Sequence, residues 1–152
     1  MRCVVQRVRS ARVSVADRDI AAIGVGLLAL IGVERGDGLD DVSYVATKLA
    51  SMRIFPDAAR SGDVRMRQSV QEVGASLLLV SQFTLLADLR RGRRPSFDAA
   101  AQPAIALERF DQVVAHVRGL GLEVSTGQFG AMMVVTLQND GPVTLLIDSR
   151  LT

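Results

Sequence analysis

Apolar and polar positions along the first third of the chain follow the spacing of β-strands. Residues 11–15 alternate with a period of two, and residues 4–8 and 20–23 have the length and composition of further strands. Residues 27–33 form an unbroken apolar run, which is typical of a central strand buried on both faces. This part of the chain is therefore predicted to form a sheet.

Two later segments have helical spacing instead. The first is expected to begin at Asp40 and Asp41, whose charges favour the first turn of a helix, and to end before Pro56. Its apolar positions recur at i, i+3, i+4, i+7 and i+10: Val42, Val45, Ala46, Leu49 and Met52. The second helix has a core face of Ala106, Phe110, Val113, Val114 and Val117, and it ends at residues 119–121. Two starts are possible for this helix. Ser96 is a good N-cap, in which case Pro103 would kink the helix. Alternatively, the main segment of the helix begins at Pro103.

The remaining apolar runs complete the prediction of the fold. Residues 75–80 form a second buried strand, residues 69–73 favour a strand over a helix, and strands at 132–137 and 145–147 flank a hairpin-like turn. Strands come in runs and do not alternate strictly with helices. We therefore expect a single α+β domain over residues 1–152, with a curled, barrel-like mixed sheet and two main helices. A doubly wound parallel sheet is the weaker alternative.

The composition and the distribution of charged residues indicate where in the cell the protein is expected. The 152 residues are 49% hydrophobic and 22% charged, as in ordinary globular proteins. The only cysteine, Cys3, excludes an internal disulfide and a cysteine-based zinc site. The longest uncharged stretch spans residues 20–33, which is too short to cross a bilayer, and no apolar block of signal-peptide length opens the chain. We expect a cytoplasmic protein that is not bound to a membrane.

Positive charge is concentrated in one loop. Arg90, Arg91, Arg93 and Arg94 account for the net charge of +2, which would be −2 without them. A solvated basic turn and a phosphate contact explain this loop equally well, since arginine binds phosphate oxygens in a planar, bidentate manner. Only 4% of the residues are aromatic, so an extended surface for stacking bases is not expected.

The usual catalytic groups are scarce. The sole histidine, His116, falls on the helix face opposite the apolar stripe, and Cys3 opens a strand with no identifiable basic partner to activate it. These positions disfavour a histidine-based triad and a metal site, and no glycine-rich phosphate loop or other cofactor motif occurs. The remaining candidate for a functional site is Ser-Gln-Phe-Thr at 81–84, at the end of a buried strand. From the sequence, this segment is either a simple strand end or a functional site.

Two short motifs together resemble the D-aminoacyl-tRNA deacylase family. They are Ser-Gln-Phe-Thr at 81–84 and Asn-Asp-Gly-Pro-Val-Thr at 139–144. The opening Met-Arg-Cys-Val-Val-Gln-Arg-Val and the Arg-Arg-Pro-Ser-Phe at 93–97 fit the same family. Either motif alone is weak, but both in this order, in a chain of this size, are specific.

The resemblance implies a homodimer with two active sites at the subunit interface. Ser81, Gln82, Phe83 and Thr84 would line each pocket, and Gly141 and Pro142 of the other subunit would reach in through a cis Gly-Pro bond. The implied substrate and partner is tRNA, through the ester that joins a D-amino acid to its 3′-terminal adenosine. The main-chain carbonyls of the Gly-Pro pair would exclude L-amino acids by steric clash. Ser81, where related enzymes have proline, favours the D-specific branch.

Several points stay open from the sequence. We expect glycyl-tRNA, including tRNA(Ala) mischarged with glycine, to be cleaved as well, because glycine has no side chain to exclude. Thr84 is favoured as a positioning group over a nucleophile, since no base is identifiable to activate it. The alternative function is a non-catalytic module that binds the tRNA 3′ end or a nucleotide, and a general small-ester hydrolase is a third possibility.

Overall fold

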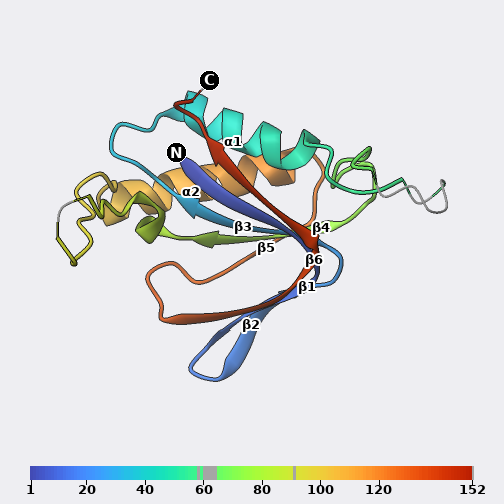
Figure 1. Ribbon diagram of the computed structural model, residues 1–152, viewed down its shortest axis with the longest axis horizontal. Helices are drawn as coiled ribbons and strands as arrows, with labels where there is room; N and C mark the ends of the chain where they lie inside the picture. The colour runs from blue at the N-terminus through green and yellow to red at the C-terminus, as the bar shows by residue number, and fades with distance from the viewer. Residues whose placement is uncertain (58, 60–64, 91, 152) are drawn as a thin grey trace.

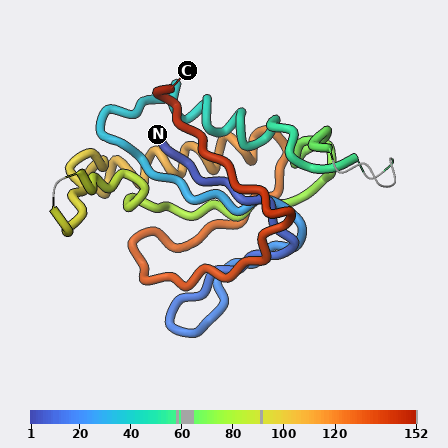
Figure 2. The backbone as a smooth tube through the Cα atoms, viewed as in Figure 1, coloured from blue at the N-terminus to red at the C-terminus, as the bar shows by residue number. Residues whose placement is uncertain are grey.

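A long first strand organises the sheet. In the computed structural model, which describes residues 1–57, 59, 65–90 and 92–151, β1 (Arg2–Val15) and β6 (Met133–Asp148) run antiparallel side by side (Figures 1 and 2). The other edge of β1 pairs first with β3 (Gly26–Gly32) and then with β2 (Arg18–Ile23). The strands predicted at 4–8 and 11–15 are thus one strand, because β6 pairs with both halves.

The sheet continues on the other side of β3. Parallel pairing adds β4 (Ser76–Ser81) and β5 (Val124–Thr126), which gives the order β2-β1-β3-β4-β5 with β6 joined to β1. Antiparallel and parallel pairs therefore share one strongly curled, nearly closed sheet (Figure 1). This confirms the predicted single α+β domain with a barrel-like mixed sheet and two main helices.

Both helices pack together on one face of the sheet (Figure 1). In α1 (Leu39–Ser51), Asp40 and Asp41 occupy the first turn as predicted, and the Asp41 carboxylate accepts the Gly38 N–H at 2.8 Å. In α2 (Pro103–Gly119), proline occupies the first helical positions, where its missing N–H costs nothing. The helix therefore begins at Pro103, and Ser96 instead supports a local turn in which its Oγ accepts the Asp98 N–H.

Alternate residues of the central strands fill two separate apolar cores. Leu27 and Ile31 of β3 and Leu79 of β4 face the helices, whereas Leu28 and Leu78 face the concave side of the curled sheet. Burial on both faces explains the unbroken apolar runs of β3 and β4.

One predicted element is absent. Residues 69–73, expected to form a strand, form a turn in which the Glu72 side chain accepts the Ser69 N–H at 2.7 Å. This local side-chain bond satisfies the backbone without a partner strand. Among the described residues, no helix is long and apolar enough to cross a membrane.

Candidate active site

The Ser-Gln-Phe-Thr motif lies where β4 leaves the sheet. Ser81 is the last residue of β4, and the Gln82 N–H donates to the Ile31 carbonyl at 2.7 Å. A short 3₁₀ helix, η1 (Phe83–Leu86), then turns the chain outward. Phe83 and Thr84 are exposed, although the core of the preceding strand β4 is buried. The motif is thus presented to solvent on a rigid support.

Two close contacts fix the shape of this turn. A Cβ atom at Gly32 would lie 2.9 Å from the Gln82 carbonyl oxygen, so glycine lets η1 approach the sheet. The Gln82 Nε2 donates a hydrogen bond to the Thr84 Oγ1. The Thr84 hydroxyl keeps its own proton available for donation to a ligand. Neither end of the Gln82 amide is a base, so this contact orients Thr84 and does not activate it.

The arginine loop is held beside the motif. The Phe83 ring meets the Phe97 ring edge-on, with centroids 4.9 Å apart and planes at 69°. Asp88 and Ser96 exchange two backbone hydrogen bonds of 2.8 and 3.0 Å, which close the base of the loop. The structure therefore brings together two segments that the sequence singled out separately.

The arginines of this loop are not equivalent. Arg90 makes several hydrogen bonds to the Asp88 carboxylate, the shortest at 2.7 Å, and they lower the pKa of Asp88 to about 2. Arg93 and Arg94 are exposed and have no ion-pair partner in the described part of the chain. Arg91 lies outside the described residues. Arg93 and Arg94 are the more available cations, because Arg90 is already paired.

The Gly141-Pro142 dipeptide projects from the middle of β6. Gln6 of β1 pairs with Thr144 of β6, and Val8 pairs with Asn139. A step of two residues along β1 therefore corresponds to a step of five residues along β6. The extra residues of β6 form a large bulge within one continuous strand. The sequence had instead predicted a hairpin turn between two strands at this place. Gly141 and Pro142 are exposed, and the peptide bond between them is cis.

Side chains on both sides brace this bulge. The Asn139 amide donates to the carbonyl oxygens of Arg7 and Val143, both at 3.0 Å. Arg7, whose side chain is 10% exposed, places its Nε 2.9 Å from the Asp140 Oδ2, a charge contact without the alignment of a hydrogen bond. Its Nη1 donates to the Ile54 carbonyl at 2.5 Å. These contacts hold the bulge to β1 and to the segment after α1.

The two motifs lie apart within one chain. The bulge is level with Arg7, which pairs with Leu27 of β3, and Leu27 in turn pairs with Leu77 of β4. Ser81 is four residues beyond Leu77 on β4, which corresponds to about 13 Å along the strand direction. Within one chain, the two motifs are therefore offset along the strand direction.

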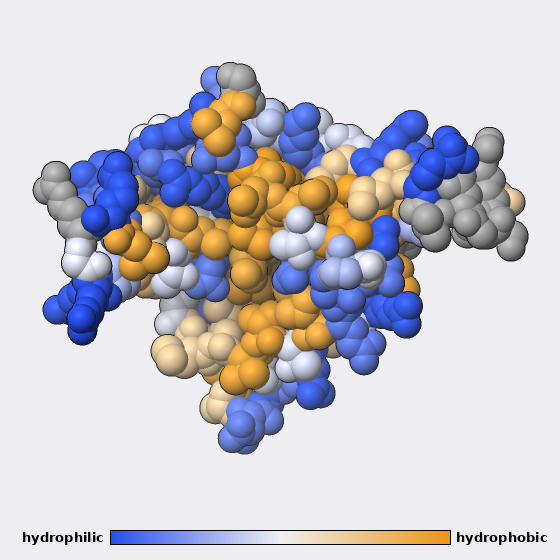
Figure 3. Space-filling view, viewed as in Figure 1, coloured by the Kyte–Doolittle hydropathy of each residue, from blue (hydrophilic) through white to orange (hydrophobic). Residues whose placement is uncertain are grey.

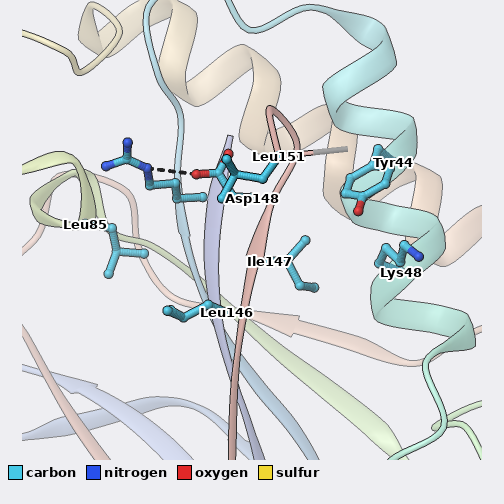
Figure 4. Close-up of a pocket in the computed structure, with 8 residues that line it drawn as sticks. Tyr44, Lys48, Leu85, Leu146, Ile147, Asp148 and Leu151 are labelled. Carbon is cyan, nitrogen blue, oxygen red and sulfur yellow. Dashed lines mark hydrogen bonds and ion pairs between the residues drawn. The ribbon is translucent and has the colours of Figure 1, made fainter.

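A groove opens next to the Ser-Gln-Phe-Thr motif. It has a volume of about 630 Å³ and lies between η1, α1 and the C-terminal half of β6 (Figure 4). Leu85 borders it on one side and Tyr44 and Lys48 of α1 on the other, while Arg2 and Asp148 form an ion pair of 3.2 Å at one end. The other lining residues are Leu146, Ile147 and Leu151.

Sequence reasoning missed these groove residues. The run Leu145-Leu146-Ile147 could have indicated them. A strand with one face on a core should alternate apolar and polar residues, so three consecutive apolar residues leave at least one on the outer face. Ile147 is buried, but Leu146 on the opposite face is 82% exposed. An orange apolar surface in Figure 3 marks the same region over β6.

The sole histidine and the sole cysteine lie outside both motifs. His116 is only half-buried on α2, and Cys3 is fully buried, where desolvation strongly raises the pKa of its thiol. Within the ranges that the structure describes, no three His, Cys, Asp or Glu side chains are grouped so as to hold a metal ion. The Ser-Gln-Phe-Thr turn itself offers hydroxyl, amide and main-chain groups.

Known proteins match the chain over almost its full length. The family model for D-Tyr-tRNA(Tyr) deacylase matches residues 4–148. The D-aminoacyl-tRNA deacylase of Desulfitobacterium hafniense (strain DSM 10664 / DCB-2) is 54% identical over 99% of this chain and 98% of the relative. That of Halalkalibacterium halodurans is 47% identical over 99% and 100%.

Solved structures agree in fold. The c-Myc DNA unwinding element binding protein has a TM-score of 0.90 at 33% identity and covers 97% of this chain and 98% of its own. A probable eukaryotic D-amino acid tRNA deacylase has a TM-score of 0.81 at 16% identity, covering 96% and 97%, and supports the fold alone. From the family match, these identities and the two motifs, the chain belongs to the D-aminoacyl-tRNA deacylase family and is an ester hydrolase.

Proposed function

We propose that the protein hydrolyses the ester of D-aminoacyl-tRNA in the cytoplasm and releases a free D-amino acid and tRNA. The observation that carries this proposal is the exposed Ser-Gln-Phe-Thr turn beside a groove, in a chain similar to deacylases over almost its whole length. Water adds to the ester carbonyl, and the bond to the ribose 3′ oxygen then breaks. That oxygen takes up a proton as it leaves.

The site needs little acid–base machinery, because an aminoacyl ester is already labile. The N–H groups of Phe83 and Thr84 head η1 and have no partner within that helix, so they are suited to bind the developing oxyanion. Thr84, oriented by Gln82, positions the ester. The ribose 2′-hydroxyl of the substrate assists the attacking water.

A second copy of the chain completes the pocket in this proposal. The two motifs are offset along the strands of one chain, and Thr84, Gly141 and Pro142 are all exposed. Large apolar side chains on β6 and just before it are exposed: Met132, Val134 and Leu146 at 92%, 64% and 82%. Figure 3 shows apolar surface over β6. Large apolar side chains exposed along one strand are suited to a protein interface. We infer a homodimer that buries β6 and brings Gly141 and Pro142 of one protomer to Thr84 of its partner.

Chirality is then read by exclusion. The carbonyl oxygens near Gly141 and Pro142 occupy the space into which an L side chain would project, so that isomer clashes. A D side chain points out of the pocket, and its identity matters little. Glycine has no side chain to exclude, so glycyl-tRNA, including mischarged tRNA(Ala), is also a substrate in this proposal.

Release of tyrosine from D-tyrosyl-tRNA and L-tyrosyl-tRNA tests the function. We expect hydrolysis of the D ester at a rate at least about 100-fold above that of the L ester, which corresponds to roughly 3 kcal/mol of discrimination. Binding of both tRNAs without hydrolysis would instead indicate a binding module. Equal cleavage of a tRNA-free D-tyrosine ester would indicate a general esterase.

A further inference from the structure

One side-chain amide closes the bulge that carries Gly141 and Pro142. The Asn139 Nδ2 donates to the Val143 carbonyl oxygen at 3.0 Å, so a single hydrogen bond spans the projecting segment. The same nitrogen donates to the Arg7 carbonyl oxygen of β1, also at 3.0 Å. A carboxamide nitrogen carries two protons, and both are used here. The Asn139 side chain therefore holds the bulge together at its base and ties it to the neighbouring strand.

The backbone ladder between β1 and β6 is interrupted at this place. Its register passes from Gln6 directly to Val8 and leaves out Arg7. Within the bulge, Pro142 has no N–H to donate. The Asn139 amide thus supplies two hydrogen-bond donors where the regular pairing of the strands is broken.

The bulge also lies where β6 passes from one apolar core to the other. Leu137 packs against the core on the concave side of the sheet, whereas Val143 is buried in the main core next to the helices. The two ends of the bulge are therefore anchored in different cores, while Gly141 and Pro142 between them are exposed. A side chain that spans the base of this segment is well placed to set how far it projects.

We propose that Asn139 determines specificity: its amide sets the position of the Gly141 and Pro142 carbonyl oxygens, and so how strongly L-amino acids are excluded. This inference rests on the proposed function, in which those oxygens occupy the space of an L side chain. Asn139 is a positioning residue that acts through the bulge, because both of its amide protons are committed to main-chain carbonyls. Exclusion by steric clash depends steeply on distance, so a small displacement of the bulge admits the L isomer.

The variants Asn139→Ala and Asn139→Asp test this role. The first removes both donors, and the second keeps the size of the side chain but places a carboxylate against two carbonyl oxygens. We expect kcat/KM for L-tyrosyl-tRNA to rise about tenfold in both variants, while the value for D-tyrosyl-tRNA stays within about threefold of the original. A purely structural role would lower both values together and leave their ratio unchanged, which would overturn the proposal.

Gln71→Ala is the matched control. The Gln71 Nε2 also donates to a main-chain carbonyl oxygen at 3.0 Å, that of Leu120, but Gln71 is exposed and lies outside both motifs. Its replacement should leave the ratio of D- to L-ester hydrolysis within about twofold of the original. An equal loss of selectivity in Gln71→Ala would mean that any lost hydrogen bond has this effect, and Asn139 would have no special role.

A spectroscopic measurement tests the geometry without any assay of activity. Asn139 is the only asparagine in the chain, so selective isotopic labelling of asparagine nitrogen gives a single side-chain amide group in the NMR spectrum. Because both amide protons are bonded to carbonyl oxygens, they should exchange with water at least about tenfold more slowly than in the unfolded chain. Equally fast exchange in the folded and unfolded states would refute these hydrogen bonds and the proposal with them.

The outcomes separate this inference from the proposed function. If the unchanged protein shows no preference for the D ester, both fail. If it prefers the D ester and the folded Asn139 variants keep the same preference, only the role of Asn139 fails. Urea unfolding midpoints identify the variants that are folded under the assay conditions.

Discussion

Arg7 and Asp140 are joined by a contact of 2.9 Å between the Nε and Oδ2 atoms, which ties the first strand to the residue before Gly141. The Arg7 side chain is 10% exposed and the Asp140 side chain 28%. Replacing Asp140 with asparagine should cost roughly 2–3 kcal/mol of unfolding free energy, because a mostly buried guanidinium loses its carboxylate. Urea denaturation measures this loss.

Arg9 supplies the matched control. It contacts the other oxygen of the same carboxylate at 3.1 Å, but its side chain is 75% exposed. Arg9→Gln should change stability by less than about 0.5 kcal/mol, since exposed ion pairs contribute little. Equal costs for Asp140→Asn and Arg9→Gln would show that Arg7 does not depend on Asp140.

Gly141→Ala should damage the bulge. Gly141 has a φ of +118°, and an added Cβ would lie 2.8 Å from the Val143 Cγ2 and 3.0 Å from the Arg7 Nη2. We expect a loss of about 1–3 kcal/mol and a smaller ratio of D- to L-tyrosyl-tRNA hydrolysis. At Gly24 an added Cβ would meet nothing within 4 Å, so Gly24→Ala should leave both quantities near their original values. Unchanged selectivity in Gly141→Ala would remove this bulge from the chirality filter.

Thr84→Ala distinguishes positioning from nucleophilic catalysis. Because Gln82 donates to the Thr84 hydroxyl and supplies no base, we expect measurable hydrolysis to remain, with a loss of about 10- to 100-fold. Single-turnover hydrolysis of D-tyrosyl-tRNA measures it. Gln82→Ala should give a smaller loss, because it removes only the orientation of Thr84. Complete inactivity of a folded Thr84→Ala protein would establish a nucleophile instead.

The loop arginines should differ in their contribution to tRNA binding. Replacing Arg93 and Arg94 with glutamine should reduce the slope of log affinity against log salt by about 1 for each phosphate group that the loop no longer binds. Arg90→Gln should reduce it less, because Asp88 already neutralises that side chain. The double variant Arg18→Gln/Arg118→Gln serves as the control. It removes the same charge from two exposed arginines outside the loop that, like Arg93 and Arg94, have no ion-pair partner in the described residues. An equal effect in this control would indicate general electrostatics and no direct role for the loop.

Asp88 should titrate at unusually low pH. Hydrogen bonds from the Arg90 side chain and backbone lower its pKa from 3.8 to about 2. Because the folded pKa is depressed, the contribution of this pair to stability is fully present above pH 3.8 and is lost as the pH falls through about 2. Titration followed by carbon NMR of the carboxyl group checks this, and Arg90→Gln should move the midpoint back up. A midpoint that does not move would exclude the Arg90 side chain as the cause.

The chain by itself specified the elements with regular apolar spacing. The α1 core face, the two buried central strands and the acidic first turn of α1 follow from periodicity and charge, which act over a few residues. Local pattern also placed the Ser-Gln-Phe-Thr motif at a strand end. By contrast, residues 69–73 have strand-like composition, but the bond between Ser69 and Glu72 closes a turn there.

Long-range pairing determined the rest. A turn signal between two apolar runs predicts a hairpin, yet β1 pairs with both runs and converts the same residues into a bulge. The contacts of Arg7 with Asp140 and of Met1 with Asp37 join residues more than 30 positions apart. The exposure of Leu146 depends on which face of β6 the rest of the chain covers. Sequence spacing cannot encode such relationships, because they arise only when the curled sheet brings distant strands and both chain ends together.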